Sequence, residues 1–382
     1  YAIDSNELDR RWKIIRDEMH NQRITLMLSC SNHSLQQGYF RYLTGIAMDR
    51  SYISPMYGLL PVDDDVIVVR SDTYQNCKEV KVDNFEDVTY CRSVNYTNLV
   101  DAEAITKIIK ERGDKKVGIA GLYNFNYLFI DYLKEQCQGI ELVDCTDFID
   151  DLVSVKSEYE QKLVLESAKI HDHIMEAIPA LLHPGIYEYE IKGFIDKLMT
   201  GMGSEHHLII IGSSKIGTEP PTYTFAPYLN RQLNIGDQVY IMVECSGPGG
   251  YFTESGRTFT VGEEPNEDLI KASKLSTQMQ SYIASIIKPG VSAEVIFNKT
   301  NEKLIDLGMP PETRIGIHGQ GYDIMQRPVF NKGETFVIKA GMNIAIHQTI
   351  VVSAFGFTVD NFLVSEDSCN LIMKNPQEVI CT

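Results

Sequence analysis

Apolar side chains near the N-terminus recur at helical spacing. Leu8, Trp12, Ile15 and Met19 follow one another at intervals of three or four residues, so they line one face of a helix with about 3.6 residues per turn. Polar and charged residues occupy most of the positions between them. The pattern therefore predicts an amphipathic helix over residues 5–22.

Short apolar runs typical of strands then alternate with helical segments up to about residue 147. The expected strands lie at 24–30, 57–69 with a turn at 63–65, 88–91 and 115–120, and the expected helices at 101–113 and 123–137. Such alternation favours an α/β domain built on a mixed or parallel sheet.

The pattern of apolar and polar residues changes after a charged segment at residues 155–162. A long helical pattern follows it and stops at Pro184 and Gly185, because neither residue continues a helix well. We place a domain boundary here, with an N-terminal domain at residues 1–152 and a C-terminal domain at residues 153–382.

The C-terminal domain combines long helices with strands and glycine-rich turns. The expected elements are a helix at 186–199, a strand at 207–212, a glycine hairpin at 238–262, helices at 266–287 and 292–307, and short strands beyond them. This order predicts a segregated α+β domain. No repeat of 20 to 50 residues is present, which excludes a solenoid.

Composition narrows the possible partners. The 382 residues carry a formal net charge of -17, which disfavours nucleic acid because phosphate neutralisation needs clustered lysine and arginine. The apolar runs are too short to span a bilayer, and the first residues do not form a signal peptide. Eight cysteines without a C-x-x-C pair indicate reduced thiols. We expect a cytoplasmic protein that binds neither membrane nor nucleic acid.

Three groups of residues in the second half carry candidate chemistry. Glu244 and Glu254 lie on opposed arms of the glycine hairpin with Arg257 close behind, His318 lies between glycines, and His347 alternates with apolar neighbours. Taken alone, such a Glu is usually solvated or salt-bridged, and a strand histidine is usually a satisfied core or surface group. Their occurrence together on strands interrupted by glycines favours a functional site, since such scaffolds present catalytic groups.

A series of ordered motifs resembles the creatinase, prolidase and aminopeptidase P superfamily, which also includes methionine aminopeptidase. The motifs are at residues 155–160, 183–191, 233–244, 250–262, 316–328, 339–348 and 362–372, with a further one at 40–46. The resemblance implies a pita-bread α+β C-terminal domain with its site at the mouth of a curved antiparallel sheet. It also implies a smaller α/β N-terminal domain of creatinase type and a homodimer.

The resemblance also implies the positions of metal ligands. Metallopeptidases of this superfamily hold two divalent ions with two Asp, one His and two Glu. The corresponding residues here are Met242 or Val243, Glu254, His318, His347 and Val359. Because apolar side chains cannot bridge two cations, we expect no ion pair. Glu254, His318 and His347, with Glu244 as a fourth group, suit at most a single divalent ion.

Three functions follow as hypotheses. The first is a creatinase-like, metal-independent hydrolase of a C–N bond in a small amino acid derivative, with His318 and His347 as acid and base and with Glu244 and Glu254 positioning water and substrate. This reading requires no cofactor, although the histidine that creatinase uses near residue 224 is absent. The alternatives are an Xaa-Pro dipeptidase or aminopeptidase P with a rebuilt metal site, and a non-catalytic binding protein on the same fold.

Several residues are candidates for holding a small-molecule substrate. Arginines offer paired donors to a carboxylate, and loop residues follow the superfamily's substrate loop. The candidates are Arg327, Arg50, Tyr223, Glu219 and Arg257.

Overall fold

The helix expected at the N-terminus begins at Ser5 and ends at Gln22 (α1), as predicted. The computed structural model describes residues 3–31, 38–47, 55–71, 88–91, 99–218, 230–351 and 354–382. It divides into two compact units, residues 1–153 and 154–382. Within the described ranges, no helix is both long enough and apolar enough to cross a membrane.

The first unit is built on a six-stranded sheet in the order β4-β3-β2-β1-β5-β6. Its strands are β1 (Leu26–Cys30), β2 (Met56–Pro61), β3 (Ile67–Ser71), β4 (Val88–Cys91), β5 (Lys116–Ala120) and β6 (Glu141–Asp144). Its other helices are α2 (Gly38–Thr44), α3 (Val100–Arg112), α4 (Tyr127–Gln136) and α5 (Thr146–Ser154). Because β2 runs antiparallel to both neighbours while β1, β5 and β6 are parallel, the sheet is mixed, and the predicted α/β domain is confirmed.

The second unit contains a nine-stranded sheet and four long helices. The helices are α6 (Glu158–Ala177), α7 (Glu188–Gly201), α8 (Glu267–Ile286) and α9 (Ala293–Asp306). The strands are β7 (His206–Lys215), β8 (Asp237–Ser246), β9 (Phe252–Val261), β10 (Ile317–Gly319), β11 (Gln326–Val329), β12 (Asn343–Val351), β13 (Phe355–Val364), β14 (Cys369–Leu371) and β15 (Ile380–Cys381). The main path runs β11-β10-β12-β13-β9-β8-β7.

The start of α6 explains the charged segment at the beginning of this unit. Ser157 Oγ accepts a hydrogen bond from Glu160 N at 3.2 Å, and Glu160 Oε2 accepts one from Ser157 N at 2.7 Å. This reciprocal capping box satisfies two backbone donors that the helix itself cannot use. A short 3-10 turn, Ile178–Ala180, follows α6 ahead of Pro184.

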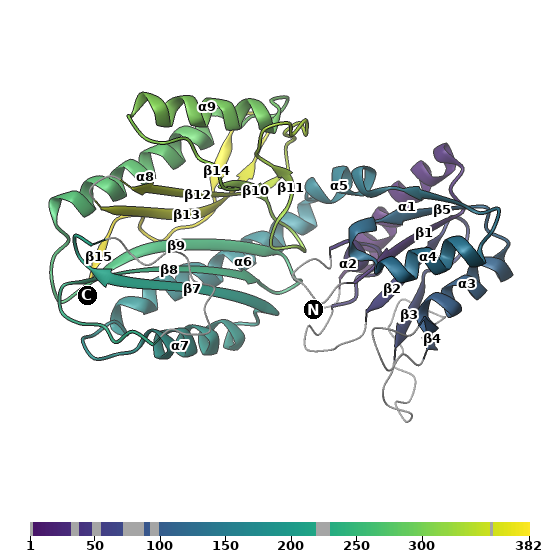
Figure 1. Cartoon of the computed structure of the whole chain (residues 1–382), viewed down its shortest axis with the longest axis horizontal. Coiled ribbons are helices and arrows are strands. Elements are labelled where there is room, and N and C mark those ends of the chain that lie inside the picture. Colours follow the sequence, from purple (N-terminus) through teal and green to yellow (C-terminus); the bar gives the residue numbers. More distant parts are fainter. Residues whose placement is uncertain are drawn as a thin grey trace. The chain divides into compact units, whose positions relative to one another are not determined.

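The helices of the second unit cover the outer face of its curled sheet (Figure 1). Side chains of α6 and α7 pack against β7, β8 and β9, whereas α8 and α9 pack against β10, β12 and β13. On β8 the outward side chains are Val239, Ile241, Val243 and Cys245, so alternation turns Tyr240, Met242 and Glu244 to the inner face. This is the predicted pita-bread fold, and its inner face carries the candidate site.

Candidate active site on the inner face of the curled sheet

Strand register places two rows of side chains across the inner face. Across β7, β8, β9, β13 and β12, the successive partners of the first row are Ile210, Met242, Gly256, Val359 and His347. His347 therefore ends a row that is otherwise apolar. Met242, not Val243, is the residue that faces the site.

The second row is polar and lies one step along the strands. Glu244 is paired with Glu254, and Ala345 is paired with both Asn361 and His318. A hydrogen bond of 2.7 Å from Glu254 N to Asn361 Oδ1 joins the two halves of this row. The hairpin glutamates and the two histidines, far apart in sequence, thus meet on one surface.

The apolar row is closely packed. Ile210, Tyr240, Met242, Phe357 and Val359 form one buried cluster. Its aromatic rings lie against glycines, because a Cβ at Gly212 would stand 1.9 Å from the Tyr240 ring and one at Gly256 would stand 2.6 Å from the Phe357 ring. This part of the inner face is therefore filled with hydrocarbon.

Three potential ligand atoms converge beside this cluster. His318 Nε2 lies 3.1 Å from His347 Nε2 and 3.9 Å from Glu254 Oε1, and His347 Nε2 lies in close contact with Glu254 Oε1. All three atoms lie within 4.8 Å of one another. In the part of the chain that the structure describes, Glu254 Oε1 is buried and receives no hydrogen bond.

The tautomer of His318 follows from its other nitrogen. His318 Nδ1 lies 3.1 Å from Gly319 O, and a carbonyl oxygen can only accept, so Nδ1 carries the proton. The Nε2 lone pair is then directed at Glu254 and His347. Metal-binding histidines are commonly oriented in this way.

Burial keeps both imidazoles neutral. It lowers the pKa of His318 to about 3, with the neighbouring His347 adding to the effect, and it lowers the pKa of His347 to about 4. A role as acid and base at pH 7 would require a pKa near neutral, which burial of these two side chains opposes. Neutral imidazoles are suited to binding a cation and poorly suited to donating a proton at pH 7.

Burial raises the pKa of both Glu244 and Glu254. Loss of solvent raises the pKa of Glu254 to about 8 and raises that of Glu244 well above its ordinary value. The facing Glu254 opposes ionisation of Glu244, whereas the Gln320 amide stabilises the Glu254 anion. Both carboxyl groups therefore favour the protonated form at pH 7 while no cation is bound, and a bound cation would favour ionisation of Glu254.

The donor set fits one divalent metal ion. Two imidazole nitrogens and one carboxylate oxygen are the ligands of several zinc hydrolases and of many iron(II) enzymes. The buried Glu254 Oε1 has no hydrogen-bond partner among the described residues, and Glu254 would supply a negative charge once a cation displaces its proton. The apolar row offers no oxygen donor for a second ion.

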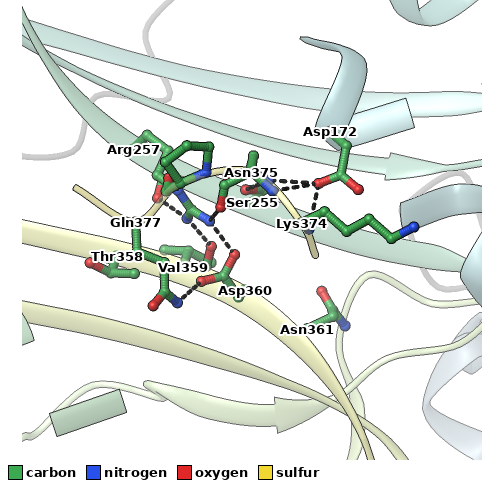
Figure 2. A network of polar contacts seen from close by, with 12 residues as sticks. Asp172, Ser255, Arg257, Thr358, Val359, Asp360, Asn361, Lys374, Asn375 and Gln377 are labelled. Atoms are coloured by element: carbon green, nitrogen blue, oxygen red, sulfur yellow. Dashed lines mark hydrogen bonds and ion pairs between the residues drawn. The ribbon is translucent and has the colours of Figure 1, made fainter. Parts of the chain in front are cut away.

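Arg257 does not have the expected substrate-binding role. It is 1% exposed and lies on the outer side of β9, where Nη2 pairs with Asp360 Oδ1 at 2.6 Å and Nε donates to Pro376 O at 2.6 Å. Figure 2 shows this guanidinium enclosed by Asp360 and the C-terminal segment. We therefore assign Arg257 to the stability of the fold.

The remaining substrate candidates are not brought to the site by what the structure describes. Arg327 forms a paired contact with Glu334, at 3.2 Å from Nε and 2.8 Å from Nη2, so its guanidinium already has a carboxylate partner. Its substrate role stays a prediction. Arg50, Glu219 and Tyr223 lie outside the described residues.

Sequence reasoning missed a group of buried amides behind Glu254. Gln320, Asn343 and Asn361 hydrogen bond to one another at the base of the second row. The available signal was the placement of Asn343 and Asn361 on strands that are otherwise largely apolar, together with the glutamine between Gly319 and Gly321.

Comparisons with known proteins agree with this architecture. Metallopeptidase family M24 matches residues 162–366, and the creatinase/prolidase N-terminal domain matches residues 11–153. A probable dipeptidase PepE of Mycobacterium tuberculosis is 27% identical over 247 residues, which span 63% of this chain and 64% of the dipeptidase. An Xaa-Pro dipeptidase of Pyrococcus horikoshii is 24% identical over 273 residues, covering 70% and 76% of the two chains.

Solved structures show the same fold. A prolidase from Thermococcus sibiricus aligns over 100% of both chains with a TM-score of 0.81 at 18% identity. The two-unit architecture thus defines a protein of the pita-bread fold class. The chain belongs to metallopeptidase family M24.

Proposed function

We propose that this chain is a metal-dependent dipeptidase that hydrolyses a peptide-type C–N bond with one divalent ion. The observation that carries the proposal is the convergence of His318 Nε2, His347 Nε2 and Glu254 Oε1 within 4.8 Å. The dipeptidase and Xaa-Pro dipeptidase names of two relatives support the substrate class. The metal-independent reading is less well supported, because both histidines are neutral at pH 7.

Four residues on the inner face would carry the chemistry. Glu254, His318 and His347 would hold the ion, which when bound polarises a carbonyl and lowers the pKa of water. Glu244 holds a proton beside this centre and can pass it to the nitrogen that leaves when the C–N bond breaks. Water supplies hydroxide to the carbonyl carbon and returns a proton to Glu244, so the atoms balance.

The apolar row contributes the surroundings. Met242 and Val359 are each at most 2% exposed; Val359 is paired with His347, and Met242 is paired with Gly256, two residues from Glu254 on β9. A site with such walls has a low effective dielectric, which strengthens the interaction of Glu254 with a cation. The same walls favour one ion over two, since a second cation would find no carboxylate there.

Chelation combined with a substrate panel tests the proposed activity. We expect the metal-free protein to lose hydrolysis of dipeptides, including Xaa-Pro dipeptides, and to regain it when one equivalent of zinc, manganese, iron(II) or cobalt is added. Creatine and related amidines should remain unchanged. Release of proline or amino acids would be measured by chromatography and the bound ion by elemental analysis.

Two outcomes would contradict the proposal. Amidine hydrolysis that survives complete chelation would favour the creatinase-like, metal-independent enzyme. Binding of a small molecule without turnover of any substrate, by protein shown to contain one ion, would favour a non-catalytic binding protein.

Replacement of Glu244 tests the proton-holding role. Glu244→Gln keeps the shape of the side chain but cannot release a proton, so kcat should fall by about 10²- to 10⁴-fold, as for loss of a general acid or base. The metal content should stay at the wild-type value, because Glu244 is not among the three donors. Loss of the ion in this variant would show instead that Glu244 is a ligand.

A further inference from the structure

The buried amides behind Glu254 form a chain with a defined direction. Asn361 Nδ2 donates to Gln320 Oε1 at 2.9 Å, and Gln320 Nε2 donates to Glu254 Oε2 at 3.1 Å. Gln320 Nε2 also donates to Ile324 O at 2.9 Å. Both amide hydrogens and the oxygen of Gln320 are therefore in use.

This arrangement prevents the Gln320 side-chain amide from rotating by 180°, which would exchange its oxygen and its NH2 group. A flipped amide would direct its oxygen at the Glu254 carboxylate and at Ile324 O, and its NH2 group at the Asn361 donor, so three favourable contacts would become repulsive. Gln320, Glu254 and Asn361 are all 0% exposed, so water cannot replace the lost partners.

Asn361 holds Glu254 at a second point. Its Oδ1 accepts from Glu254 N at 2.7 Å, while its Nδ2 also donates to Asn343 Oδ1 at 2.8 Å. Asn343 Nδ2 in turn donates to Phe252 O at 3.1 Å, on the same strand as Glu254. The backbone and one carboxylate oxygen of Glu254 are thus both fixed by amides.

We propose that Gln320 is a positioning residue. Its hydrogen bond to Glu254 Oε2 keeps that oxygen from binding a metal ion and leaves Oε1 as the single carboxylate oxygen that can bind one. The inference rests on the proposed metal site. It adds that Glu254 binds the ion through one oxygen and that the site prefers ions of low coordination number. One oxygen and two imidazoles suit zinc, with four ligands, whereas a carboxylate with both oxygens free suits ions of higher coordination number.

The test compares two glutamine variants. In Gln320→Met the donor to Glu254 is lost with little change in volume. Gln280→Met is the matched control, because Gln280 is 1% exposed and donates to Ile346 O at 3.1 Å from α8, on the outer face. Zinc and manganese affinities would be measured by competition with a chelating dye, and the cobalt(II)-substituted proteins by absorption spectroscopy.

We expect Gln320→Met to weaken zinc binding about 10- to 100-fold, as for other residues that orient ligands. Its zinc-to-manganese preference should narrow and its cobalt spectrum should change, while Gln280→Met keeps the wild-type affinity and spectrum. If Gln320→Met does not fold, Asn361→Ser removes the donor that orients Gln320, and the same shifts are expected.

Each contrary result has a distinct meaning. If wild-type protein binds zinc and Gln320→Met matches it in affinity, ion preference and spectrum, the positioning role is overturned and the proposed function stands. If Gln280→Met shows the same losses, the effect is one of general stability, and the positioning role is again overturned. If wild-type protein binds no divalent ion, both proposals fail.

Discussion

Replacement of His347 with alanine should release the metal ion and abolish hydrolysis. The change removes one of three donors and leaves the buried Glu254 carboxylate facing a single imidazole. Metal-ion stabilisation of the transition state is worth several kcal/mol, so kcat/KM should fall by about 10³-fold or more. Elemental analysis and dipeptide turnover measure the two effects.

Two further variants make this result specific. His173→Ala removes an exposed histidine on α6 whose Nδ1 lies 3.3 Å from Lys169 O, and it should change neither metal content nor rate. His347→Glu supplies a carboxylate oxygen in place of the imidazole nitrogen and should retain part of the bound ion. Full metal content and activity in His347→Ala would disprove the three-donor site.

The second large effect concerns stability. Arg257→Met leaves the buried Asp360 without its ion-pair partner and removes donors to the carbonyls of Gly256 and Val359, at 2.7 Å and 3.0 Å. Breaking a buried pair in this way costs about 3 to 5 kcal/mol. We expect a loss of that size in the free energy of unfolding, measured with urea.

A surface ion pair provides the comparison. Arg314, with a half-exposed side chain, contacts Glu312 at 2.6 Å, so Arg314→Met should cost only about 1 kcal/mol or less. Combining Arg257→Met with Asp360→Leu removes both charges and should recover part of the stability. Equal losses for Arg257→Met and Arg314→Met would contradict the structural role of Arg257.

Local patterns predicted most of the elements and named three residues that the structure brings together on the inner face. Helical spacing gave α1, and the ordered motifs gave the pita-bread fold with Glu254, His318 and His347. Strand parity could also have shown that Glu254 and Arg257, three residues apart on β9, point to opposite faces. The proximity of Arg257 to Glu254 in sequence therefore does not bring its side chain to the inner face.

Other features depend on contacts that sequence does not display. The neutral state of His318 and His347 results from their burial by several strands. The sequence around each histidine does not show how deeply its side chain is buried. The amides of Gln320, Asn343 and Asn361 come from three separate segments. Only the folded register brings them to one carboxylate.

The packing of the apolar row bears on how the site can change during evolution. Tyr240 and Phe357 fill the space over Gly212 and Gly256, and Met242 and Val359 complete the layer. A single Met242→Asp or Val359→Glu substitution would bury an unpaired carboxylate among these rings, at a cost of several kcal/mol. A two-ion centre on this inner face would therefore require several coordinated substitutions, each unfavourable alone, so no single substitution creates one.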